Sequence, residues 1–142
     1  MTTTTSRKMF VNLAVKDLAK TVDFFTRLGF EFDPRFTDEN ATCMIVNDDA
    51  FVMLLVEDFF KNFTKKGIAD ATTQNEAIMA LSADSKQQVD DLVDRTLAAG
   101  GQASADTTDQ GFMYERSFQD LDGHLWSAFW MDPSALEQAP EQ

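Results

Sequence analysis

The chain of 142 residues has a single cysteine, Cys43, so no disulfide can form within it and nothing in its cysteine content requires an oxidising compartment. Its longest apolar run, Ala50–Val56, has seven residues, whereas a helix needs about 20 to span a bilayer. The first eight residues are polar and lack the apolar stretch of a signal peptide. We therefore expect a soluble, cytoplasmic protein.

Basic residues are also scarce, since 12 Lys and Arg stand against 24 Asp and Glu and give a formal net charge of −12. This charge repels phosphates and anionic membrane surfaces, so it argues against nucleic-acid and membrane partners. The charge does not argue against small cationic ligands. Histidine is limited to His124, which follows a predicted turn, and a lone imidazole needs partners to do acid–base work.

Large apolar side chains are abundant, because 44% of the residues are apolar and 13 are Phe. A chain of this length can bury a core without a disulfide or a structural metal. We expect one domain over residues 1–142.

The same order of elements is predicted twice. Asp17 and Ser85 each precede a helical apolar pattern that a glycine ends, at Gly29 and Gly100. Alternating or β-rich segments predict strands at residues 9–15, 30–36, 41–46, 51–56, 77–83, 102–107, 112–118 and 125–130. A short helix is expected at 58–65 and one helical turn in the tail, 133–142. The halves match at an offset of 68 residues, so we predict an α+β fold of two β-α-β-β-β modules, at about 8–65 and about 76–132, forming a curved mixed sheet around a cleft.

Two stretches resemble the vicinal oxygen chelate superfamily, which includes glyoxalase I, extradiol dioxygenases and bleomycin-resistance proteins. The opening stretch runs over residues 11–30, with the sequence VNLAVKDL followed by VDFF and LGF, and the closing stretch is DLDGHLW at 120–126. The branch that looks most similar consists of bacterial proteins labelled as predicted lactoylglutathione lyases. The resemblance covers about residues 8–132 and implies the fold of those proteins and a homodimer, but the fold hosts many reactions.

The resemblance also implies where a catalytic divalent cation would be held. The enzymes of this superfamily bind the ion with His and Glu side chains, at positions that fall here on Phe10, Met53, Ile78 and Ser127. Hard and borderline cations need oxygen or imidazole donors, and of these four side chains only the Ser127 hydroxyl offers a weak one. We therefore expect no metal and no other cofactor.

The same positions, with their neighbours, are the expected lining of a mainly apolar cleft. Alternation along the first strand sends Asn12 to the same side as Phe10, where its amide bonds either a ligand or neighbouring backbone and water. Tyr114 can line the cleft or pack in the core. The predicted ligand-binding residues are Phe10, Asn12, Met53, Ile78, Tyr114 and Ser127, and no catalytic residue is identified.

The leading hypothesis is a metal-free protein that binds a small hydrophobic or cationic molecule. The alternative is a glyoxalase-like lyase or isomerase, or a dioxygenase-like enzyme, with metal ligands at unusual positions such as Glu57, Asp120 or His124. A third hypothesis is a metal-free enzyme that uses Tyr114 or Glu115 for proton transfer.

Overall fold

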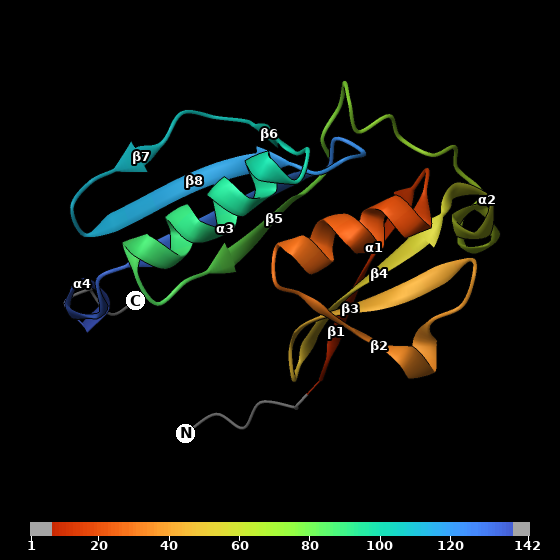
Figure 1. Ribbon diagram of the computed structural model, residues 1–142, viewed down its shortest axis with the longest axis horizontal. Coiled ribbons are helices and arrows are strands. Elements are labelled where there is room, and N and C mark those ends of the chain that lie inside the picture. The colour runs from red at the N-terminus through yellow and green to blue at the C-terminus, as the bar shows by residue number, and fades with distance from the viewer. Residues whose placement is uncertain (1–6, 138–142) are drawn as a thin grey trace. The chain divides into compact units, whose positions relative to one another are not determined.

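The computed structural model describes residues 7–137 and divides the chain into two compact units, residues 1–69 and residues 70–142 (Figure 1). Each unit has its own sheet and its own long helix.

The first unit contains a four-stranded sheet in the order β1-β4-β3-β2. Strands β1 and β4 run parallel, and the other neighbouring pairs are antiparallel. The elements are β1 (Met9–Val15), α1 (Leu18–Arg27), β2 (Glu31–Asp33), the 3-10 turn η1 (Pro34–Phe36), β3 (Ala41–Asn47), β4 (Ala50–Val56), α2 (Glu57–Phe60) and the 3-10 turn η2 (Lys61–Phe63).

The second unit repeats this plan in a five-stranded sheet of order β5-β9-β8-β6, with the short β7 also paired to β8. Strands β5 and β9 are parallel, as β1 and β4 are in the first unit. The elements are β5 (Ile78–Ser82), α3 (Lys86–Ala98), β6 (Gln102–Ala103), β7 (Thr108–Asp109), β8 (Met113–Gln119), β9 (Leu125–Met131) and α4 (Pro133–Glu137). The predicted α+β class and the doubled β-α-β-β-β order are confirmed.

Both long helices begin where the sequence predicts. The Asp17 carboxylate accepts a hydrogen bond from the Lys20 amide at 3.0 Å, and the Ser85 hydroxyl accepts one from the Gln88 amide at 3.1 Å. Each side chain thereby satisfies an amide that has no partner within its helix.

In each unit the long helix lies across one face of the sheet, and the core of that unit sits between its helix and its sheet (Figure 1). In the first unit Phe24 and Phe25 of α1 are buried together with Leu54 of β4. In the second unit Val89 and Val93 of α3 are buried. The rings of Phe118 on β8 and Trp126 on β9 are parallel there, with centroids 6.2 Å apart.

The second predicted strand, 30–36, is shorter than expected. It ends at Asp33, because Pro34 has no amide hydrogen for a sheet ladder and its fixed φ suits the start of a helical turn. The Asp33 carboxylate accepts a hydrogen bond from the Arg35 amide at 3.0 Å and caps η1. The predicted strand 102–107 likewise reduces to β6, and the predicted helix 58–65 to α2 and η2.

The turn between β8 and β9 is fixed by a buried carboxylate. Asp120 is 6% exposed, and one of its oxygens accepts hydrogen bonds from the amides of Asp122 and His124, both at 3.0 Å. The other oxygen accepts the indole N–H of Trp126 at 3.0 Å. Burial raises the pKa of Asp120, while the charge of His124 and these donors oppose that shift.

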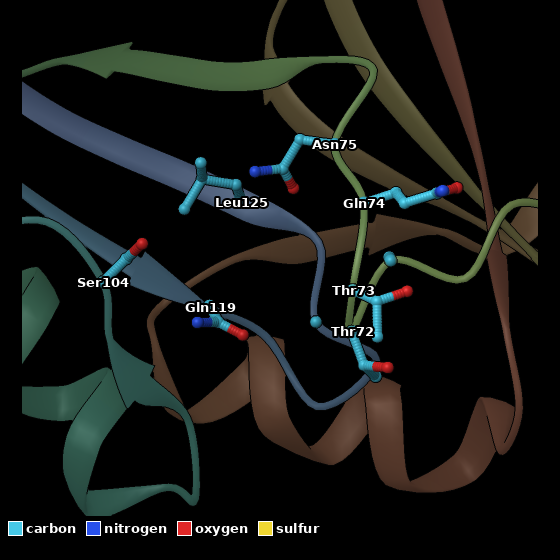
Figure 2. A pocket seen from close by; sticks show the side chains of 9 residues that line it. Thr72, Thr73, Gln74, Asn75, Ser104, Gln119 and Leu125 are labelled. Atoms are coloured by element: carbon cyan, nitrogen blue, oxygen red, sulfur yellow. The ribbon is translucent and has the colours of Figure 1, made fainter.

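Gly123 in this turn has a φ of 89°, and a Cβ there would lie 2.9 Å from the Ala71 carbonyl oxygen. The backbone of residues 71–72 therefore packs directly against the turn (Figure 2). Gly111 shares a positive φ of 80° but has open space around it, and Gly67 has open space without a positive φ.

These three glycines separate backbone strain from crowding. We expect Gly111→Ala to lower the free energy of unfolding by about 1–2 kcal/mol, the usual cost of a left-handed conformation for a residue with a Cβ. Gly123→Ala is expected to cost more, since the loop backbone must also move. Gly67→Ala should lie within about 1 kcal/mol of the parent chain. Urea unfolding of the three variants measures the order, and equal losses for Gly111→Ala and Gly123→Ala would show that the loop does not press on the turn.

Candidate functional site

The first unit has an aromatic hollow on the face of its sheet that carries Phe10. Phe10 on β1 lies beside Phe51 on β4 in the parallel register, and their rings stack with centroids 4.8 Å apart. With Phe36 of η1 and Ile45 of β3 they line a hollow of about 490 Å³. Phe10 and Phe36 remain 46% and 53% exposed. Large rings in a hollow of this volume suit an apolar organic molecule.

Paired charges stand at the rim of this aromatic hollow. The Arg35 guanidinium donates to both carboxylate oxygens of Asp33, at 2.8 Å through Nη2 and 3.1 Å through Nε, and this lowers the pKa of Asp33. The same guanidinium lies 5.5 Å from the centroid of the Phe36 ring. Lys8 forms an ion pair with Asp49 at 3.6 Å, donates to the Asp48 carbonyl oxygen at 2.6 Å and lies 5.8 Å from the centroid of Phe51. The rim is therefore close to neutral.

Cys43 also lines the aromatic hollow, at its floor, and is 1% exposed. Burial raises the pKa of its thiol, so little thiolate is present at neutral pH. Cys43 is therefore a buried thiol of low reactivity.

Asn12 and Met53 face the same side of the first sheet as Phe10. They lie opposite each other in the β1–β4 register, two residues along from the Phe10–Phe51 pair. The Asn12 amide donates to the Phe10 carbonyl oxygen at 3.2 Å, so it bonds neighbouring backbone, which is one of the two roles that the sequence left open. Met53 is half-buried. Three of the six predicted site residues thus share one sheet face in the first unit.

Ile78 and Ser127 share the open face of the second sheet. Ile78 is 59% exposed at the start of β5, opposite Leu125 of β9, while Ser127 lies two residues further along β9 and is 3% exposed. The Ser127 hydroxyl donates to a carboxylate oxygen of Glu115 at 2.6 Å.

Tyr114 lies on the other face of this second sheet, against α3. Its hydroxyl donates to the Asp90 carboxylate at 2.6 Å, and Arg116 donates to Asp90 at 2.9 Å and to Asp94 at 3.1 Å. The hydrogen bond to Asp90 raises the pKa of Tyr114, and the same bond is the main cause of the lowered pKa of Asp90. Strand alternation therefore puts Tyr114 and Ser127 on opposite faces of the sheet. The hydrogen bond from Tyr114 to Asp90 links β8 to α3.

The side chains at the four positions implied for a divalent cation do not fit one. Phe10, Met53 and Ile78 have no oxygen or imidazole donor, and the Ser127 hydroxyl is engaged by Glu115. Within residues 7–137, no three His, Cys, Asp or Glu side chains gather as a metal ion would require. Asp120, one of the unusual ligands considered, uses its oxygens to hold its own turn.

A smaller pocket in the second unit is lined mainly by polar side chains, with Ala71 and Leu125 as its apolar ones. It has a volume of about 120 Å³ and lies between residues 71–75 and the turn before β9. Asn75 and Gln119 extend their amides toward it, and Ser104 lies at its edge (Figure 2). No charged side chain lines it, so it suits water or a small neutral polar group.

Known proteins share part of this sequence and its fold. A family model described as bleomycin resistance protein-like N-terminal matches residues 7–47. Solved structures with the same fold include a glyoxalase-related enzyme from Fulvimarina pelagi, which is 17% identical, with 89% of this chain and 88% of that chain covered and a TM-score of 0.74. The chain therefore resembles the vicinal oxygen chelate superfamily in its N-terminal segment and shares the fold of its glyoxalase and bleomycin resistance proteins. The resemblance noted in the sequence is thereby confirmed at the level of the superfamily.

Two further solved structures with this fold show the range of the similarity. A hypothetical protein from S. aureus is 29% identical over 87% of this chain and 92% of its own, with a TM-score of 0.74. The genomically encoded fosfomycin resistance protein FosX from Listeria monocytogenes is 19% identical over 94% of this chain and 98% of its own, with a TM-score of 0.61. No curated protein matches the chain. Within the described residues, no helix has the length and apolar character needed to cross a membrane.

Replacing Tyr114 by Phe tests its structural role. We expect Tyr114→Phe to lower the free energy of unfolding by about 1 kcal/mol near neutral pH, since one hydrogen bond to a partly exposed carboxylate is lost. Asp90 has a lowered pKa in the folded state, so its contribution is present above the unfolded pKa and is lost as the pH falls through the folded one. The difference between variant and parent should therefore shrink in acid.

Urea unfolding at about pH 7 and about pH 2.5 measures this difference. Asp90→Asn serves as the companion variant, because it removes the titrating group itself. A stability loss in Tyr114→Phe that does not change with pH would contradict the assignment of the Tyr114–Asp90 bond.

Proposed function

We propose that the protein binds a small hydrophobic or cationic organic molecule without a metal ion, and that the aromatic hollow of the first unit is the main contact surface. The observation that carries this proposal is the stacked pair Phe10 and Phe51, exposed beside Phe36 in a hollow of about 490 Å³. Exposed rings that line a hollow lose contact with water when an apolar ligand enters, and this drives binding.

The chemistry of the residues supports binding over metal-dependent turnover. A lyase or dioxygenase of this superfamily would need a cation to polarise its substrate, and the matching positions carry Phe10, Met53 and Ile78. Two acidic groups that line the aromatic hollow have shifted pKa values, and neither shift favours proton transfer: Arg35 lowers the pKa of Asp33 and keeps it ionised, and burial raises the pKa of Cys43 and keeps it protonated.

Elemental analysis and a turnover assay separate the two functions. The purified protein is analysed for bound metal and then assayed with the hemithioacetal of methylglyoxal and glutathione, with Ni²⁺ or Zn²⁺ added. We expect no stoichiometric metal and no turnover. Metal bound at one equivalent together with turnover would establish the glyoxalase-like alternative and reject the binding proposal.

Loss of one ring from the stack tests the aromatic hollow directly. The probe is N-phenyl-naphthylamine, an uncharged aromatic dye whose fluorescence rises in apolar surroundings. We expect Phe10→Ala to weaken its binding about five- to tenfold, because an aromatic contact contributes about 0.5–1.5 kcal/mol beyond its buried area.

Phe112→Ala is the matched control for this titration. Phe112 and Phe10 are both 46% exposed, but Phe112 lies in the second unit and outside the hollow. Circular dichroism confirms that both variants fold. If the two substitutions weaken dye binding equally, the dye is not held in the aromatic hollow and the proposed contact surface is wrong.

A further inference from the structure

The negative charge of the protein is concentrated in its second unit. Residues 70–142 contain 14 Asp and Glu but only three Lys and Arg, so they carry a net charge of −11 out of the total of −12. A field of this strength attracts cations to the second unit. The field does not by itself define a site. The position of Glu115 on the second sheet is the further observation that does.

On the open face of the second sheet, Glu115 is the one charged residue that strands β5, β8 and β9 contribute. In the register of β8 and β9, Glu115 lies opposite Phe129, and alternation puts both on the face away from α3. The other residues of β5, β8 and β9 on this face are uncharged, namely Ile78, Ala80, Ser82, Met113, Ser117, Gln119, Leu125, Ser127 and Met131.

Among the residues that the structure describes, no Lys or Arg of the second unit pairs with Glu115. Arg116 is its neighbour in sequence but points to the opposite face, where it pairs with Asp90 and Asp94. Lys86, at the start of α3, pairs with Asp109 at 3.5 Å. The third basic residue, Arg95, lies on α3, which covers that same opposite face.

The Glu115 carboxylate is nevertheless held in place. The nearly buried Ser127 hydroxyl donates to one of its oxygens at 2.6 Å, and within residues 7–137 no other hydrogen bond or ion pair to this carboxylate is found. Glu115 is half-buried. A half-buried anion with one neutral donor is poorly solvated and poorly paired, so a cation that reaches it gains more than it would at a free surface.

The surroundings select the kind of cation. A metal ion needs several oxygen or nitrogen donors, and Glu115 is a single carboxylate without a second ionised group on its sheet face. Phe129 lies directly opposite Glu115 in the strand register, so its aromatic ring belongs to the neighbouring position on the same sheet face. A carboxylate next to an aromatic ring suits an organic ammonium group, which gains from both the ion pair and the cation–π contact.

We propose that the Glu115–Ser127 pair binds the ammonium group of an organic amine on the open face of the second sheet. The pair gives the protein a preference for cationic over neutral ligands of the same shape. This inference rests on the proposed function in one respect, that the protein binds small organic molecules, and it narrows their class to amines.

Two probes of nearly the same shape test it by isothermal titration calorimetry. Naphthylmethylamine is cationic at neutral pH, and naphthylmethanol is its uncharged counterpart. We expect the parent chain to bind the amine about tenfold more tightly than the alcohol, and Glu115→Gln to remove that preference by weakening the amine alone. Glu115→Gln keeps an acceptor for the Ser127 hydroxyl, so the fold is retained. Ser127→Ala should weaken the amine by a smaller factor, because the carboxylate is then less fixed.

Asp106→Asn is the control for the general field. It changes the net charge of the second unit by the same amount at an exposed position outside the strands. We expect it to leave the amine affinity within about twofold, given screening at physiological salt. Equal losses in Glu115→Gln and Asp106→Asn would mean that the field alone attracts the amine, and this would overturn the site.

The failure of this inference can be told from failure of the proposed function. Equal affinity of the parent chain for amine and alcohol overturns the Glu115 site, while binding of the uncharged dye that depends on Phe10 still supports the aromatic hollow. Dye binding that ignores Phe10, together with amine binding that requires Glu115, rejects the hollow and retains the site. Absence of binding for all three probes rejects both.

Discussion

In each unit a single long helix covers one face of the sheet, and this one-sided cover decides which strand side chains pack beneath the helix and which lie on the open face. Side chains alternate along a strand, so half of them join the core under the helix and the other half point to the open face. Leu54 and Trp126 are buried on the helix side, while Phe10 and Ile78 are exposed on the open side. Both open faces therefore carry large apolar groups that the fold itself does not need to bury, and the candidate sites lie on these faces.

The two open faces have different chemistry even though the units repeat one plan. In the first unit the rings of Phe10, Phe36 and Phe51 surround a hollow whose rim charges are already paired. The second unit presents a single carboxylate, Glu115, with a strong excess of negative charge around it. A duplicated architecture has thus produced one apolar face whose charges are paired and one largely apolar face with a single carboxylate, and within residues 7–137 neither gathers the donors of a metal centre.

Much of the fold could be predicted because its local signals are strong. Asp17 and Ser85 cap helices because their short oxygens reach the third amide beyond them, and Gly123 tolerates the positive φ that its turn requires. The end of β2 was harder to predict. It depends on a competition at Asp33 and Pro34 between continuing a strand and capping a turn, and alternation of Phe residues favours the strand.

Predicting the site residues required the pairing register of the strands more than the composition of the chain. The sequence alone placed Phe10, Asn12 and Met53 on one face, since each lies in a strand with a clear alternation. It did not place Tyr114, because the choice between faces depends on how β8 pairs with β9, and the turn held by Asp120 sets that pairing. The bond between Glu115 and Ser127 depends on the same register, so a reading of β8 by itself could not find it. Phe36 enters the aromatic hollow only because η1 replaces the end of the predicted strand.

The distribution of Trp126, Trp130 and Cys43 gives each half of the molecule its own intrinsic reporter. Both tryptophans belong to residues 70–142, and the only thiol lies buried in residues 1–69. Indole emission therefore follows the loosening of the C-terminal half, and the rate at which a thiol reagent labels Cys43 follows the opening of the N-terminal half. Whether the halves melt together or one after the other can be followed in a single unlabelled, unmutated sample.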